Sequence, residues 1–228
     1  MNKPSTRLQF VQERISNACI TIGRQPGEVS LLAVSKRHPA KKIAALNDLG
    51  VVAFGENLLT EALRKQPELL GLNLQWHYIG AIQSNKTRAI AENFHWVQSV
   101  DREKILRRLA AQRPASSEPL NICLQVNIDR EPQKAGASAE EILSLARIAG
   151  ELDNIKFRGL MAIPRMTADQ VQQHDSFCRV RVLFDALRNA GHDIDTLSMG
   201  MSADLEIAIA EGSTMVRIGT DLLGKRKK

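Results

Sequence analysis

The feature that most constrains the fold is a regular alternation of short apolar runs with stretches of helical spacing. Apolar, β-branched runs of strand length recur eight times along the chain. The stretches between them carry apolar residues at helical spacing, for example over 41–49, 103–111, 139–151 and 171–190. Strands buried on both faces read as continuous apolar runs, and a strand-then-helix repeat favours a parallel sheet. Eight such units predict an α/β fold, a single (β/α)8 TIM barrel.

The predicted strands are 29–36, 51–57, 74–80, 96–101, 120–128, 155–163, 196–202 and 214–220. An extra helix over 5–22 precedes the first strand. The chain has 228 residues, an ordinary size for one barrel, and its only linker-like segments are short polar stretches such as 113–118. We therefore expect residues 1–228 to form a single domain, ending in a basic tail at 225–228.

Composition narrows the class of protein. The hydrophobic fraction of 43% and the charged fraction of 25% are ordinary globular values. The apolar runs are shorter than a membrane helix, and the start MNKPSTRLQF lacks a secretory signal, so we expect a cytoplasmic protein. Cys19, Cys123 and Cys178 form no CxxC pair and are expected to be buried, reduced thiols. No cluster with metal-ligand spacing appears, so no metal is predicted.

The net charge of +6 is concentrated at one end of the chain. The tail at 225–228 supplies four of these charges, which leaves +2 for the body. Such a tail is expected to be solvated, with a contact to phosphate or RNA as the alternative. Only 4% of the residues are aromatic, so no stacking surface for nucleic acid accompanies it.

Reactive groups of a (β/α)8 barrel gather at the C-terminal ends of its strands. Lys36 closes the apolar run LLAVSK, where its amine is expected to point at the barrel mouth. Desolvation and nearby cations lower the pKa of a lysine and favour the neutral amine, which forms a Schiff base with an aldehyde. The alternative is a lysine that reaches from the strand end into solvent.

Two later segments have the residue types of an anion site. In SMGMSADLE, Gly200 and Ser202 precede a helix expected to begin near Ala203, where backbone N–H groups and the serine hydroxyl could bind phosphate. The alternative is that Ser202 caps this helix. In MVRIGTDLLG, Gly219 and Thr220 offer further backbone and hydroxyl donors.

Arg217 lies within the last apolar run and needs a partner. Alternation places it on the same strand face as Gly219, from where it could reach a ring nitrogen. An internal ion pair with a carboxylate is the alternative. Weaker candidates are Asn57 in FGEN, the turn residues 83–86, and His77 in WHYIG, for which a structural role is preferred over a catalytic one. No GxSxG or Walker motif appears.

Together these motifs resemble the YggS/PROSC family of pyridoxal phosphate (PLP) homeostasis proteins. The resemblance spans nearly the whole chain. It is carried by AVSK at 33–36, FGEN at 54–57, WHYIGAIQSNK at 76–86, SVDR at 99–102, QVNI at 125–128, Lys134, Gly136, GLMAIP at 159–164 and SMGMSADLEIAIAEGSTMVRIGT at 198–220. Arg37-His38 and Ala81-Ile82 depart from commoner pairs in the family, which could alter the mouth of the site but leaves cofactor binding intact.

The resemblance implies a barrel of the alanine racemase N-terminal type, with PLP attached to Lys36 as a reversible Schiff base. It implies that Arg217 contacts the pyridine nitrogen, that Ser202, Gly219 and Thr220 bind the phosphate, and that Asn57 lies near the ring. The implied function is intracellular PLP (vitamin B6) homeostasis without robust turnover. A lone barrel is compatible with a monomer, which we expect. PLP-dependent apo-enzymes are candidate recipients.

Two other functions stay open from the sequence. A PLP-dependent amino-acid racemase with weak activity needs a second acid or base opposite the lysine. The chain's only tyrosine, Tyr78, lies within the third predicted strand, so we expect no robust enzyme activity. A third hypothesis is that the basic tail docks a PLP-dependent enzyme or nucleic acid.

Overall fold

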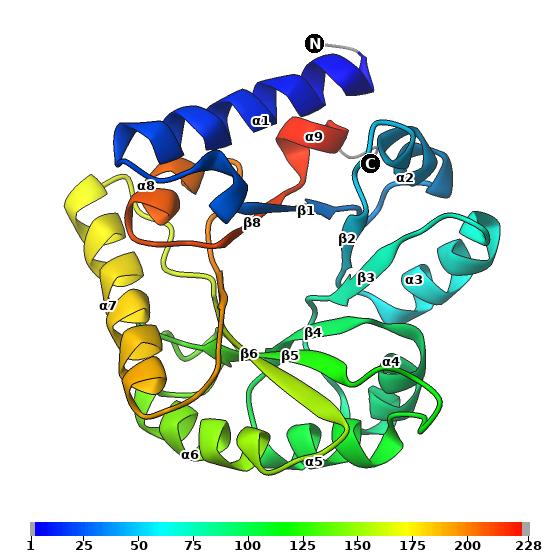
Figure 1. Cartoon of the computed structure of the whole chain (residues 1–228), viewed down its shortest axis with the longest axis vertical. Helices are drawn as coiled ribbons and strands as arrows, with labels where there is room; N and C mark the ends of the chain where they lie inside the picture. The colour runs from blue at the N-terminus through cyan, green and yellow to red at the C-terminus, as the bar shows by residue number, and fades with distance from the viewer. Residues whose placement is uncertain (1–2, 225–228) are drawn as a thin grey trace.

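All eight predicted strands form, and they pair in sequence order into a closed parallel barrel (Figure 1). The structure is a computed structural model that describes residues 3–224. The strands are β1 (Ser30–Val34), β2 (Ala53–Glu56), β3 (Gln75–Tyr78), β4 (Trp96–Val100), β5 (Leu120–Val126), β6 (Ile155–Ala162), β7 (Thr196–Ser198) and β8 (Met215–Ile218). Closure pairs β1 with β8, so neither terminal strand leaves an open edge.

Helices form an outer ring around the strands (Figure 1). They are α1 (Pro4–Thr21), α2 (Ala40–Asn47), α3 (Leu59–Lys65), α4 (Thr87–Asn93), α5 (Glu103–Gln112), α6 (Ala139–Gly150), α7 (Gln170–Asn189), α8 (Leu205–Ala210) and α9 (Thr220–Leu223). Short 3-10 turns cover Pro26–Glu28, Gln66–Leu69 and Ser84–Lys86. The predicted (β/α)8 architecture with its extra N-terminal helix is therefore confirmed.

The N-terminal helix is fixed to the barrel by an apolar stripe and an arginine. Leu8, Val11, Ile15 and Cys19 recur every three or four residues on the buried face of α1. On its polar side Arg14 forms ion pairs with Glu206 of α8 and Asp221 of α9. These contacts hold α1 against the two elements that follow β7 and β8 (Figure 1).

The apolar core has two parts. The larger part lies between the strands and the helical ring and includes Phe54, Ile43 and Phe94. The smaller part lies inside the barrel and consists of Trp96, Cys123 and Met161. The layer around this inner cluster is partly polar, and the His77 ring stacks on Trp96 with centroids 5.0 Å apart.

The cysteine prediction is correct for two of three residues. Cys19 and Cys123 are buried thiols, and burial raises the pKa of Cys123 to about 12. Cys178, however, is only half-buried; it lies on α7, where its sulfur accepts a hydrogen bond from Arg181 Nη2. All three are free thiols.

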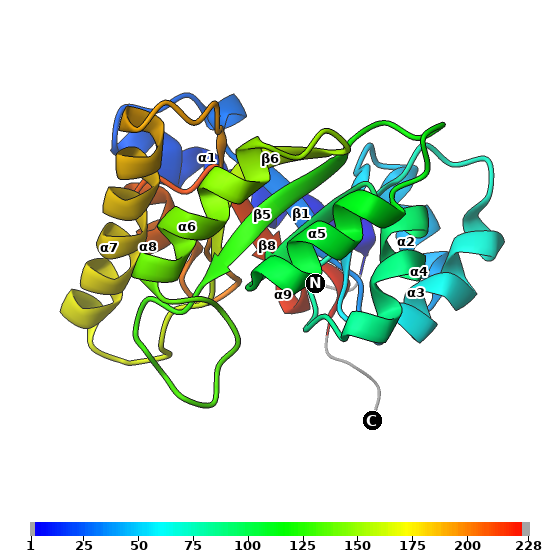
Figure 2. The ribbon, with the colours of Figure 1, turned by 90° about the horizontal axis from the view of Figure 1, so that it is seen from below.

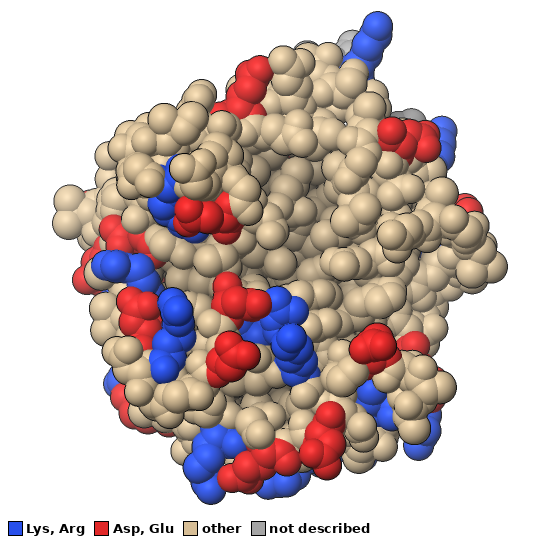
Figure 3. All heavy atoms as spheres, in the orientation of Figure 1, with Lys and Arg blue, Asp and Glu red and all other residues tan. Residues whose placement is uncertain are grey.

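Acidic and basic side chains are interspersed on the face shown in Figure 3, as expected for a body of nearly balanced charge. The long loop after β5 projects from the barrel on the side of α9 (Figure 2). Within residues 3–224, no helix is long and apolar enough to span a membrane. The basic tail at 225–228 lies outside the described residues.

The buried histidine predicts how stability depends on pH. Desolvation lowers the pKa of His77 to about 3, and His95 adds to the effect. An unfolded histidine titrates near pH 6.5, so between about pH 6.5 and 3 only the unfolded chain gains this proton. The free energy of unfolding therefore falls as the pH drops through this window, by at most about 1.4 kcal/mol per pH unit from His77.

His77→Phe keeps an aromatic ring on Trp96 but cannot titrate. Urea unfolding measured between about pH 4 and 6 should give a shallower dependence of the unfolding free energy on pH for this variant than for wild type. Identical slopes would contradict a buried, neutral His77.

Candidate functional site

A pocket opens at the C-terminal ends of the strands and brings together most of the predicted site residues. Its volume is about 230 Å³. It is lined by Val34, Lys36, Ile79, Met161, Ile163, Met201, Ser202, Ala203, Arg217, Gly219 and Thr220. Five of the six predicted cofactor residues are among them; Asn57 is not.

The lining of this pocket is positively charged. Lys36 and Arg217 contribute two cationic groups, and no aspartate or glutamate lines it within the described chain. Ser202, Gly219 and Thr220 add hydroxyl and backbone donors on the same side. This arrangement suits an anionic ligand with an apolar body, because Ile79, Met161 and Ile163 supply the apolar wall.

Lys36 reaches the pocket because the barrel strand ends just before it. Alternation puts Val34 and Lys36 on the inward side of the chain, and both line the pocket. The next residue, Arg37, has a φ of 61°, in the left-handed region that non-glycine residues rarely adopt. Its backbone N–H donates to Glu61 Oε1 at 2.6 Å, which holds this strained turn in place.

A buried charge network, formed by Glu56, Glu61, Lys65 and Ser35, lies behind this turn. Lys65 Nζ is 2.7 Å from both Glu56 Oε1 and Glu61 Oε1, and it also donates to the Ser35 carbonyl. The Ser35 hydroxyl donates to Glu56 Oε1 at 2.6 Å. Burial raises the pKa of Glu56, against the opposing effect of its hydrogen bonds from Lys65 and Ser35. The network thus anchors the residues on both sides of Lys36.

Arg217 is held inside the barrel by neutral acceptors. Its side chain is only 4% exposed. Nη1 donates to the carbonyl and hydroxyl of Ser198 at 2.6 and 2.8 Å, and Nη2 donates to the Ala162 carbonyl at 2.8 Å. No carboxylate among residues 3–224 forms an ion pair with it, so the alternative of an internal ion pair is wrong. Desolvation lowers the pKa of Arg217 to about 10, and the guanidinium stays charged at neutral pH.

The segment after β7 differs from its prediction. The seventh strand ends at Ser198, and the helix α8 begins at Leu205 rather than near Ala203. Asp204 occupies the N-cap position in place of Ser202, and its Oδ1 accepts a hydrogen bond from the Met201 N–H at 2.6 Å. Ser202 is therefore a turn residue facing the pocket, and the alternative of a helix-capping Ser202 is wrong. At the next strand end, α9 begins at Thr220 directly after Gly219.

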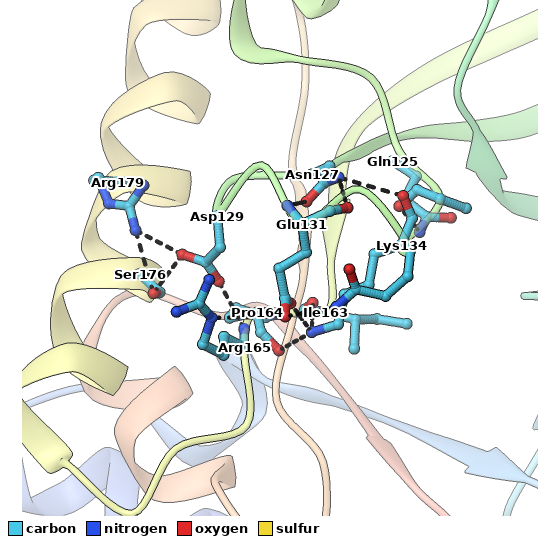
Figure 4. A network of polar contacts seen from close by, with 12 residues as sticks. Gln125, Asn127, Asp129, Glu131, Lys134, Ile163, Pro164, Arg165, Ser176 and Arg179 are labelled. Carbon is cyan, nitrogen blue, oxygen red and sulfur yellow. Dashed lines mark hydrogen bonds and ion pairs between the residues drawn. The ribbon is translucent and has the colours of Figure 1, made fainter.

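The loop after β5 is anchored to one rim of the pocket (Figure 4). Lys134 Nζ donates to the carbonyls of Ile163 and Pro164 and pairs with Glu131. Asn127 closes the loop by accepting from the Glu131 N–H and donating to the Glu131 carbonyl. Because Ile163 lines the pocket, Lys134 connects this loop to the pocket wall.

Three residues considered in the sequence, Asn57, His77 and Tyr78, do not line the pocket. Asn57 follows β2 with its backbone against Gly80, where an added Cβ would overlap the Asn57 carbonyl, and its contact with a ring stays a prediction. His77 lies inside the barrel with 1% exposure, as the preferred structural role requires. Tyr78 faces the helical ring, and its hydroxyl donates to the Ala81 carbonyl.

The charge network behind Lys36 was not predicted from the sequence. A signal for it was present in α3, where Leu59, Ala62 and Lys65 share a buried face at a spacing of three residues. A lysine on an apolar helix face needs a carboxylate partner, and Glu56 at an outward strand position provides it. No comparable sequence pattern marked the residues of the apolar pocket wall.

This network makes a prediction about stability. Lys65→Met removes the cation between two carboxylates and leaves Glu56 buried without its partner, so the free energy of unfolding should fall by about 3 kcal/mol. Arg88→Met is a matched control, because Arg88 forms an exposed pair with Glu92 and its loss should change stability by less than about 0.5 kcal/mol. Urea unfolding measures both, and equal effects would contradict the anchoring role.

Comparison with known proteins places the chain in a family. Residues 12–227 match the family model described as alanine racemase, N-terminal domain. A pyridoxal phosphate homeostasis protein of Pseudomonas aeruginosa is 55% identical over 99% of this chain and 97% of its own length. One from Escherichia coli is 45% identical over 99% of this chain and 98% of its own length.

The solved structure of PipY from Synechococcus elongatus with PLP bound is similar in fold and sequence. Its TM-score is 0.82 at 34% identity, and the match covers 94% of this chain and all of PipY, at 100%. The chain therefore belongs to the family of pyridoxal phosphate homeostasis proteins, which are built on the alanine racemase N-terminal domain.

Proposed function

We propose that this chain binds pyridoxal 5'-phosphate in the pocket at the strand ends and takes part in intracellular vitamin B6 homeostasis. It holds the cofactor reversibly on Lys36 and limits the free aldehyde, without robust turnover. The observation that carries this proposal is one pocket that joins a lysine amine to a buried guanidinium without any lining carboxylate.

The residues present fit this cofactor group by group. When bound, PLP supplies an aldehyde that adds an amine reversibly, and Lys36 provides that amine. Ser202, Gly219 and Thr220 offer hydroxyl and backbone donors for a phosphate dianion. Arg217 would donate to the pyridine nitrogen, and Asn57 would lie near the ring. The positive lining favours the anionic ligand as a whole.

The comparisons support the same function. Relatives that match nearly the whole chain are named pyridoxal phosphate homeostasis proteins, and PipY has been solved both with PLP bound and without it. Support for the individual site residues comes from the pocket that assembles Lys36, Ser202, Arg217, Gly219 and Thr220.

The lining chemistry favours a carrier over a racemase. Racemisation needs a second acid or base facing the lysine, yet Lys36 and Arg217 are the only titratable groups in the described lining. Tyr78 is turned away, and burial raises the pKa of its phenol. Arg217 already carries a positive charge and so disfavours a further proton on a ring nitrogen.

The proposal also covers the domain organisation, the location, the oligomeric state and the partners of the protein. Residues 1–228 would act as one domain, as a cytoplasmic monomer that passes PLP to apo-enzymes. The described barrel supports the single domain, because one closed sheet supplies all parts of the pocket. Docking by the basic tail at 225–228 stays a prediction, since these residues lie outside the described structure.

The first test is covalent capture of the cofactor. Wild type mixed with PLP should turn yellow, and borohydride reduction followed by peptide mapping should find the label at Lys36. Lys36→Ala should stay colourless and unlabelled, because the amine is gone. Lys104→Ala is the control, since Lys104 is exposed on α5 and its loss should leave the labelling of Lys36 unchanged.

Wild type without a label at Lys36 would overturn the proposed site. The same samples, incubated with L-alanine and assayed by chiral chromatography, test turnover. Rapid formation of the D-enantiomer by wild type but not by Lys36→Ala would favour the racemase instead.

Gly219 tests the predicted phosphate side. An added Cβ there would contact Val34 only at 3.5 Å or more, and its φ is −110°, so Gly219→Ala should fold. The methyl group would nevertheless occupy the pocket wall and should weaken PLP binding about tenfold, measured by absorbance titration. In the control Gly27→Ala the new methyl group meets nothing within 4 Å, and PLP affinity should be unchanged. Wild-type affinity in Gly219→Ala would remove this residue from the site.

A further inference from the structure

A row of polar side chains crosses the barrel interior beneath the pocket. It consists of His77 on β3, Gln98 on β4, Ser198 on β7 and Arg217 on β8, and all four are buried. Barrel interiors are usually filled by branched apolar side chains. Four adjacent polar groups at such positions therefore need a physical reason.

Each neighbouring pair in this row is joined by a hydrogen bond. Arg217 Nη1 donates to Ser198 Oγ at 2.8 Å. Ser198 Oγ donates to Gln98 Oε1 at 2.7 Å. Gln98 Nε2 lies 2.9 Å from His77 Nδ1. The row thus forms one continuous chain from the far side of the barrel to the guanidinium.

The donors and acceptors fix the direction of donation along this chain of hydrogen bonds. Ser198 has one hydroxyl proton, which it gives to Gln98, so its oxygen is free to accept from Arg217. The Gln98 amide nitrogen can only donate, so His77 Nδ1 accepts and the imidazole proton is on Nε2. Every dipole in the chain therefore turns its negative end toward Arg217.

The shared direction of these dipoles offsets the cost of burying the charge of Arg217. A buried guanidinium without an ion-paired carboxylate is costly, because its hydration is lost. Asp204 raises the pKa of Arg217 through its charge, but the two side chains form no ion pair. Hydrogen bonds arranged head to tail polarise one another and strengthen the acceptor at the end of the chain. Ser198 Oγ, backed by Gln98 and His77, is that acceptor, and it leaves the pocket itself free of negative charge.

We propose that Ser198, Gln98 and His77 are positioning residues, which hold the Arg217 guanidinium charged and oriented toward the cofactor ring without an ion-paired carboxylate. This inference rests on the proposed function as far as the ring is concerned. The chain of hydrogen bonds itself belongs to the protein without cofactor.

The surroundings of His77 agree with a neutral imidazole at the end of the chain. Trp96 stacks on its ring, and Arg158 lies over the Trp96 ring, with its guanidinium carbon 4.6 Å from the ring centroid. His95 also disfavours a charge on His77. A protonated His77 would have to donate from Nδ1, which would remove the acceptor that Gln98 requires.

The test compares variants that break the chain of hydrogen bonds with variants that leave it intact. Ser198→Ala and Gln98→Met remove successive links. Ser213→Ala is the matched control: Ser213 is another fully buried serine, and the acceptors around its hydroxyl are the backbone carbonyls of residues 197, 199 and 215, the nearest being that of 199 at 2.7 Å. Ser198→Thr keeps the hydroxyl and serves as the conservative rescue.

Both chain-breaking variants should still be labelled at Lys36 by PLP and borohydride. Their PLP affinity should be about tenfold weaker, and the pH dependence of their near-visible absorbance should shift, because the guanidinium is no longer held at the ring. Ser213→Ala and Ser198→Thr should keep the wild-type spectrum. A wild-type affinity and spectrum in Ser198→Ala would overturn the proposal.

A second measurement uses the protein without cofactor. Nitrogen-15 NMR of wild type should show His77 as the Nε2–H tautomer, and Gln98→Met should disturb that tautomer. A proton on Nδ1 in wild type would overturn the proposed chain. If wild type takes no label at Lys36, the proposed function fails, and this NMR result still decides the positioning chain.

Discussion

The pairing of β1 with β8 is the contact on which the site depends. It sets Leu32 opposite Arg217 and Ala33 opposite Ile218, so the first and last strands end at the same mouth of the barrel. Lys36 follows one of these strands, and Gly219 and Thr220 follow the other. Residues separated by most of the chain therefore line one pocket, and without closure Lys36 would not share a wall with Gly219 and Thr220.

The protein stabilises two buried cations, Lys65 and Arg217, by different physical means. Lys65 lies outside the strand ring, where Glu56 and Glu61 neutralise it directly, and the result is a rigid support for the turn around Lys36. Arg217 lies inside, where a carboxylate would compete with an anionic ligand for the same guanidinium. Neutral oxygens hold it instead, so its positive charge remains available to the pocket.

The strand order and the position of Lys36 could be predicted because they follow from local patterns. Apolar runs mark strands, and a parallel barrel turns strand ends into a site. Partners across the barrel could not be found this way, since the contact of Gln98 with Ser198 depends on strand stagger. The late start of α8 was also hidden, because Asp204 takes the cap position expected for Ser202. Lys65 was not predicted either, because its carboxylate partner Glu56 lies on a different element.

The closure between the first and last strands also has a consequence for synthesis. During translation Lys36 is synthesised early, whereas Arg217 and Thr220 emerge only when the chain is almost complete. Contacts between such distant residues form slowly, because a long loop must close first. A nascent chain therefore exposes Lys36 long before the rest of the pocket lining exists, and under the proposed function selective capture of PLP would be a property of the finished molecule alone.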